Sequence, residues 1–184
     1  MRKSLVLAVA AMSTAGIAAL VPTAANAGTT VNVNLSGGAL SVTEPSTAAT
    51  LSGSAAAGTV LTQSLGSSTV TDNRGTLAGW TVTAKTSGDL ANAGNTHTIS
   101  LGTTIAGGPL NMATGAVTAN GTSLLTGVGA GAGGSLNPSA AITVATGASL
   151  AGGGSYSYNP TLTFTVPPNT FADNYSTVVT QTVS

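Results

Sequence analysis

The chain contains no cysteine and very little charge, with four basic and four acidic side chains among its 184 residues. Without cysteine the fold has no disulfide to stabilise it and depends on core packing. So few basic side chains exclude the positive surface that nucleic-acid binding needs. Because charge is scarce, we expect the polar surface to consist mainly of threonine, serine and asparagine.

The N-terminus has the organisation of a secretory signal peptide. Arg2 and Lys3 precede an apolar stretch over residues 5–21, and Ala25-Asn26-Ala27 has the small-x-small pattern of a cleavage site. The apolar stretch is short for a membrane span and contains polar residues, so a retained anchor is the weaker interpretation. We therefore predict a signal peptide over residues 1–27 and one secreted domain over residues 28–184, with no membrane span after cleavage.

The secreted chain would carry two basic and four acidic side chains, a net charge of −2. Its C-terminus shows no hydrophobic tail with basic residues, which is the pattern of covalent wall sorting. We therefore expect any association with a cell wall to be non-covalent.

Apolar residues alternate with polar ones along most of the secreted chain, as they do in strands with one buried face. The longest run extends from Tyr156 to Val166, and Pro160 predicts a bend, a bulge or an edge position within it. Shorter runs are expected at 31–42 around a Gly37-Gly38 turn, and at 60–65, 80–84, 99–101, 142–144 and 175–183. Eight to ten short strands without helical periodicity predict an all-β fold, an antiparallel β-sandwich of the Ig-like or Greek-key type, with a barrel as the alternative.

Residues 127–135, GVGAGAGGS, form the one low-complexity tract. We predict a mobile loop there. The tract also matches G-x-G-x-x-G, but it lacks the strand-to-helix context of a dinucleotide site.

The side chains needed for catalysis are few. His97 is the only histidine, and the secreted chain has four acids: Glu44, Asp72, Asp89 and Asp173. This inventory predicts no enzyme, no metal site and no cofactor, although four acids could still converge in space. We expect His97 to be a hydrogen-bonded polar residue at a strand end.

Residues 70–84, VTDNRGTLAGWTVTA, contain the only tryptophan of the chain. Asp72 can accept a hydrogen bond from a backbone amide ahead of it, and Gly75 can adopt a positive φ, which predicts a turn and a hairpin. Trp80 then shares a face with Val82, and Lys85 points to the opposite face.

The D-N-R-G turn followed by G-W-T-V resembles the first motif of the WxL domain family of Gram-positive cell-surface proteins. The run TLTFTVPPNTFADNYSTVVTQTVS resembles the C-terminal end of that family, but a glutamine replaces its second tryptophan. The resemblance implies a β-rich domain that binds peptidoglycan non-covalently and works beside partner surface proteins. The positions that carry it besides the tryptophan are Gly75, Gly79, Val82, Tyr175 and Gln181.

Two roles are open for Trp80. Its phase favours the core, whereas the alternative is a platform for a wall glycan, with Arg74 or Asp72 donating or accepting hydrogen bonds beside it. For Gln181, an exposed rim position is the simpler expectation, because a buried amide needs partners. Two further function classes stay open: a self-associating subunit of a surface fibre or coat, and an adhesin.

Overall fold

The computed structural model describes residues 31–54, 56–76, 78–102, 108–123, 126–150 and 153–184. The chain divides into two units, Met1–Asn34 and Leu35–Ser184. The described residues contain no helix, and so none that could span a membrane. The predicted signal peptide over residues 1–27 lies outside the described residues.

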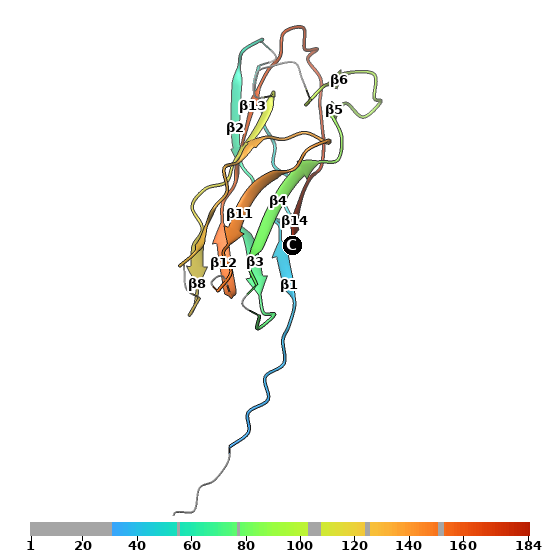
Figure 1. Ribbon diagram of the computed structural model, residues 1–184. Coiled ribbons are helices and arrows are strands. Elements are labelled where there is room, and N and C mark those ends of the chain that lie inside the picture. Colours follow the sequence, from blue (N-terminus) through green and yellow to red (C-terminus); the bar gives the residue numbers. More distant parts are fainter. Residues whose placement is uncertain (1–30, 55, 77, 103–107, 124–125, 151–152) are drawn as a thin grey trace, which may run out of the picture. The chain divides into compact units, whose positions relative to one another are not determined.

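Fourteen strands form in the described part of the chain, and all of their pairings are antiparallel (Figure 1). Sheet A has the order β1-β3-β12-β8, sheet B β10-β7-β13-β2, sheet C β14-β4-β11-β9, and β5-β6 is a small hairpin. The strands are β1 Leu40–Thr43, β2 Val60–Ser64, β3 Ser68–Asp72, β4 Trp80–Thr86, β5 Leu90–Ala91, β6 Thr98–Ile99, β7 Leu110–Ala113, β8 Thr118–Asn120, β9 Val128–Ala130, β10 Gly134–Ser135, β11 Ile142–Gly147, β12 Gly154–Tyr158, β13 Thr161–Thr165 and β14 Val179–Val183. The predicted all-β antiparallel class is confirmed.

Sheets A and B share three chain segments that run from one sheet into the other: β2–β3, β7–β8 and β12–β13. The segment with β12 and β13 is interrupted at Pro160, whose carbonyl accepts a hydrogen bond from Leu65 N at 2.9 Å. Its even-numbered side chains from Tyr156 to Val166 are buried or half-buried. The predicted run is confirmed, and its strand pairing is interrupted at Pro160, where the chain passes from sheet A to sheet B.

The core lies between sheets that face each other. The ring of Trp80 in β4 of sheet C packs on that of Tyr156 in β12 of sheet A, with 5.8 Å between centroids. Buried residues of sheet B, Leu110, Met112 and Leu162, belong to the same core cluster. This layering is consistent with a sandwich, and the sheets end in edge strands rather than closing into a barrel.

The predicted hairpin over residues 70–84 is wrong. Strand β3 pairs with β1 and β12, whereas β4 pairs with β11 and β14, so the chain crosses from sheet A to sheet C between them. The connection, residues 73–79, is too long for a tight hairpin turn. Because the sheets face each other, Val70 and Trp80 still point into one interior.

The predicted strand pair over residues 31–42 is also absent. Only Leu40–Thr43 forms a strand, β1, and it pairs with β3. Val31, Val33 and Leu35 precede it with exposed side chains and no strand pairing. Gly38 does not turn the chain back on itself; instead its N–H donates to Asn73 O.

The predicted mobile loop at residues 127–135 contains two strands, β9 at the edge of sheet C and β10 at the edge of sheet B. Glycine is present here because backbone segments pack closely against each other, and not because the tract is mobile. A Cβ added at Gly131 would lie 2.3 Å from Thr143 O, and one at Gly133 would lie 2.4 Å from Met112 O. Only glycine lets these backbones approach so closely.

Candidate functional site

Trp80 is a core residue. It is 2% exposed and packs on Tyr156, and a Cβ added at Gly147 would meet its indole ring at 2.5 Å. The core role predicted for this side chain is confirmed. An indole enclosed in this way has no free face for a sugar to stack on.

Asp72 and Arg74 bind each other. Arg74 Nε and Nη2 each lie 2.9 Å from a carboxylate oxygen of Asp72, and the backbone N–H of Arg74 donates to the same carboxylate at 3.1 Å. Arg74 Nη2 also donates to the carbonyls of Ala78 and Gly79. The Arg74 hydrogen bonds hold the pKa of Asp72 below its usual value. Both side chains therefore stabilise the 73–79 connection from within.

The motif positions around this connection are structural. Gly75 has a φ of +67°, as the turn prediction required. A Cβ at Gly79 would lie 2.6 Å from Gly147 O, so the residue must be small. Val82 is fully buried, and Lys85 lies exposed on the opposite face of β4, as predicted.

Gln181 is buried, contrary to the expected rim position. Its side chain joins two sheets: Nε2 donates to Ser68 Oγ at 3.0 Å, and Oε1 accepts from the hydroxyl of Tyr158. Its backbone N–H donates to Glu44 Oε1 at 2.7 Å. The hydroxyls of the facing sheet satisfy the amide, which makes its burial acceptable.

The network around Gln181 predicts a loss of stability in strong alkali. Burial raises the pKa of Tyr158 from 10.0 to about 12. Below pH 10 the phenol is neutral in both states and has no effect. Between pH 10 and 12 the unfolded chain releases the proton first, so stability falls as pH rises, by up to about 1.4 kcal/mol per pH unit. Urea unfolding between pH 10 and 12 should show this fall in the free energy of unfolding. In Tyr158→Phe the free energy of unfolding should depend less on pH in that range, and its pH dependence near pH 8 should be unchanged.

A second group of polar side chains lies between the β5–β6 hairpin and the segment before β14. His97 Nδ1 and Asn92 Nδ2 lie 2.9 and 2.8 Å from Asp173 Oδ2. Asn92 Oδ1 in turn accepts from the backbone of Thr96 and of His97. The hydrogen bond between His97 and Asp173 is the main cause of a lowered pKa of Asp173, and the hydrogen bond from Asn92 lowers it further. His97 is thus a hydrogen-bonded residue immediately before β6, at a strand end as predicted.

An aromatic ring packs on the histidine of this polar group. The ring of Phe171 stacks on His97 with 4.4 Å between centroids and an interplanar angle of 14°. Phe171 is nevertheless 64% exposed, and its carbonyl accepts from the hydroxyl of half-buried Tyr175. We call His97, Phe171, Asp173 and Tyr175, together with Asn92, the aromatic end.

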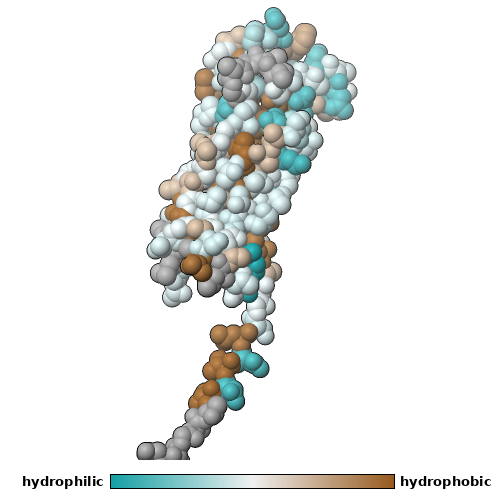
Figure 2. All heavy atoms as spheres, viewed as in Figure 1, coloured by the Kyte–Doolittle hydropathy of each residue, from teal (hydrophilic) through white to brown (hydrophobic). Residues whose placement is uncertain are grey.

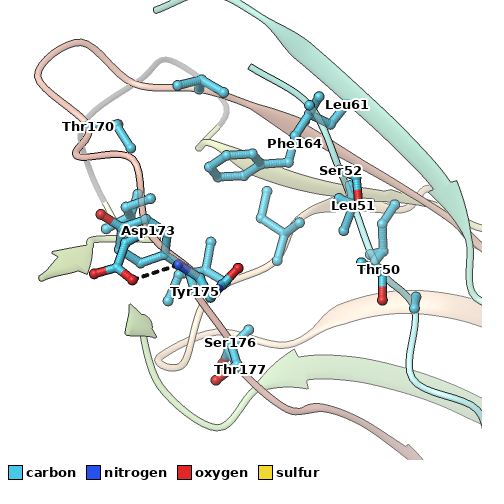
Figure 3. A pocket seen from close by; sticks show the side chains of 18 of the residues that line it. Thr50, Leu51, Ser52, Leu61, Phe164, Thr170, Asp173, Tyr175, Ser176 and Thr177 are labelled. Carbon is cyan, nitrogen blue, oxygen red and sulfur yellow. Dashed lines mark hydrogen bonds between the residues drawn. The ribbon is translucent and has the colours of Figure 1, made fainter. Parts of the chain in front are cut away.

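Two hollows adjoin the aromatic end. A polar one of about 350 Å³ is lined by residues 96–100 and 167–171 together with Tyr175. A larger one of about 640 Å³, the groove, has an apolar floor. Figure 3 shows Leu61 and Phe164 at one side of the groove, Thr50, Leu51 and Ser52 at another, and Asp173 and Tyr175 across from them.

The acids Glu44, Asp72, Asp89 and Asp173 each have a partner of their own. Glu44 accepts from Gln181, Asp89 accepts from Leu101 N at 2.8 Å, and the other two bind Arg74 and His97 as described. Among the described residues no group of three or more histidine and acidic side chains could hold a metal ion.

Comparison with family models, curated proteins and solved structures found no match to this chain.

The aromatic end was only partly foreseen. The sequence identifies His97, Asp173 and Tyr175 one by one, but no pattern in it places them together. Phe171 and Asn92 were missed. A phenylalanine in the polar stretch NTFADN is the one available signal.

Proposed function

We propose that the protein is a secreted, non-enzymatic cell-surface protein that associates non-covalently with a wall glycan such as peptidoglycan. The aromatic end is the contact surface in this proposal. It combines an exposed ring with carboxylate, amide and imidazole groups beside a hollow, which is how proteins usually hold a polar ring-shaped ligand.

The exposed ring of Phe171 is the observation that carries the proposal. A sugar presents a CH-rich face that packs on an aromatic ring and hydroxyls that need donors and acceptors around it. His97 uses Nδ1 for Asp173, and among the described residues none forms a hydrogen bond with its Nε2. That nitrogen belongs to the ring that stacks on Phe171 and is suited to a hydroxyl contact. The second oxygen of Asp173 accepts from Asn174 N at 2.8 Å and keeps a further lone pair for a hydroxyl.

The proposed WxL-like character concerns the fold and the cell-surface role. In this proposal the enclosed Trp80 and the Asp72–Arg74 pair organise the domain, and the glycan contact moves to the aromatic end. Membership of that family is part of the proposal and rests on the sequence motifs alone.

Sedimentation with purified wall sacculi tests this function. Residues 28–184 should pellet with sacculi and stay in solution alone. Phe171→Ala should weaken binding roughly 5- to 13-fold, because an aromatic contact contributes about 1 to 1.5 kcal/mol. Leu150→Ala is the matched control, since Leu150 is also an exposed apolar side chain.

Equal binding by the Phe171→Ala and Leu150→Ala variants would remove the aromatic end as the contact surface. No pelleting of the unaltered chain with sacculi would contradict the proposed function itself.

A second candidate is a self-associating subunit of a surface fibre or coat. The observation that favours it is the exposed segment Val31–Leu35, in which apolar and polar residues alternate as in a strand that lacks a partner (Figure 2).

A further inference from the structure

We propose that the aromatic end binds glycans with free amino groups, such as N-deacetylated amino sugars, in preference to N-acetylated or anionic glycans. This inference deepens the proposed function and rests on it, because it names the class of sugar that the same surface holds. Three observations carry it: the charge of the surface, the hydrogen-bonding groups that are left open on it, and the exposed ring of Phe171.

The surface around the aromatic end carries a negative charge. Asp173 is the only acidic side chain that lines the two hollows, and the basic side chains of the described residues, Arg74 and Lys85, line neither. His97 and Tyr175 are the other titratable side chains there. The hydrogen bond from His97 is the main cause that lowers the pKa of Asp173, so the carboxyl group is ionised near neutral pH. This charge repels anionic ligands and attracts cationic ones.

The side-chain donors of the aromatic end are already used. The amide nitrogen of Asn92 donates to Thr96 Oγ1 at 2.9 Å and to Asp173 Oδ2 at 2.8 Å. The hydroxyl of Tyr175 donates to a backbone carbonyl at 3.0 Å. Nδ1 of His97 lies 2.9 Å from Asp173 Oδ2. A carboxylate or phosphate group of a ligand, which needs donors, finds none free among these side chains.

Two acceptors of the aromatic end remain open. An ionised carboxylate only accepts, so the proton between His97 and Asp173 belongs to Nδ1, and Nε2 of the neutral ring keeps its lone pair. Asp173 Oδ1 accepts from Asn174 N and keeps a further lone pair. A protonated amine offers three donors and no acceptor, and its hydrogen bond to a carboxylate is charge-assisted. An amine therefore complements these two acceptors better than a hydroxyl or an acetamide group does.

The ring of Phe171 adds a second preference for a cation. One face of the ring stacks on His97, yet the side chain is 64% exposed, which leaves the other face open to a ligand. An aromatic face attracts a cation electrostatically, and it also packs on the CH-rich face of a sugar. Because Asp173 hydrogen-bonds to the same imidazole, the ring and the carboxylate lie on one small surface. A sugar with a free amine can contact both.

Oligosaccharides of equal length that differ in charge test this preference. The probes are the tetramer of glucosamine, the tetramer of N-acetylglucosamine and tetragalacturonic acid. Isothermal titration calorimetry with residues 28–184 at neutral pH gives each dissociation constant. The glucosamine tetramer should bind roughly 5-fold more tightly than the acetylated one, as one exposed charge pair allows, and tetragalacturonic acid should bind most weakly. Added salt should reduce the difference, because it screens exposed charges.

Two variants that each remove one negative charge show whether the preference is local. Asp173→Asn should bind the glucosamine and N-acetylglucosamine tetramers with similar affinity. Glu44→Gln is the matched control and should keep the preference, because Glu44 lines neither hollow and its amide replacement can still accept from Gln181 N. Phe171→Ala should weaken the binding of both tetramers. Circular dichroism of each variant checks that it folds, and the salt dependence of the unaltered chain reports the charge contact without any variant.

Several results would overturn the inference. They are equal affinity for the two amino-sugar tetramers, binding of tetragalacturonic acid as tight as that of the glucosamine tetramer, no binding of any probe, or a preference that persists in Asp173→Asn. Sedimentation with sacculi is a separate measurement. A chain that pellets with sacculi but shows no preference for free amines keeps the proposed function and loses only this inference.

Discussion

Trp80→Ala is expected to destabilise the domain by about 3 to 5 kcal/mol, the usual cost of removing a large aromatic side chain from a core. The indole is 2% exposed and fills the space between Tyr156 of the facing sheet and the backbone of Gly147. Small neighbours cannot close a cavity of that size, because they lie on strands fixed by their own pairing.

Thermal unfolding followed by circular dichroism measures this effect. For a domain of roughly 150 residues the expected loss corresponds to a Tm lower by about 6 to 20 °C. Lys85→Ala on the same strand is the control, since its side chain is exposed and its loss should change stability by no more than about 0.5 kcal/mol. An unchanged Tm for Trp80→Ala would contradict the core role.

Gln181→Ala is expected to cost about 2 to 4 kcal/mol. The substitution leaves two buried hydroxyls, of Ser68 and Tyr158, without their partner, and an unsatisfied buried group costs about 1 to 3 kcal/mol. The hydrogen bond from the backbone of residue 181 to Glu44 should persist. Urea unfolding at neutral pH gives the difference in free energy.

An apolar replacement separates hydrogen bonding from cavity formation. Gln181→Met combined with Tyr158→Phe and Ser68→Ala removes all three polar groups together and should recover much of the loss. Thr180→Ala, which changes an exposed neighbour on β14, should be near neutral. If Gln181→Met alone were as stable as the unaltered chain, the amide network would contribute nothing to stability.

The fold class could be predicted because alternation is a local signal. From Tyr156 to Val166 each apolar residue points to one side. The only irregularity, at Pro160, can be predicted because proline has no backbone N–H to donate to a neighbouring strand. Short strands were harder to find. Strands β8 and β9 hold three residues each, too few for a period of two to stand out.

Strand partners could not be predicted, because pairing depends on residues far apart in sequence. The turn chemistry at Asp72 and Gly75 was right, yet the strands on either side belong to different sheets. Gln181 shows the same limit. Its burial depends on Ser68, which is 113 residues away and supplies a hydroxyl that no local pattern reveals.

The aromatic end lies beyond sequence analysis for a similar reason. His97 and Asp173 are 76 residues apart, and only the folded chain brings the β5–β6 hairpin beside the segment that leads into β14. Composition limited the chemistry to a few polar groups, but it gave no indication of where they meet.

The three segments that continue from sheet A into sheet B affect how the domain comes apart. Pairing is interrupted at Pro160 by no more than a few residues, so a strand that leaves one sheet pulls on its own continuation in the other. Sheets A and B are consequently expected to unfold together rather than separately. Loosening the strand pairing in one sheet therefore weakens the other sheet too. A domain built in this way is expected to resist partial unfolding, the state in which proteases cut most readily.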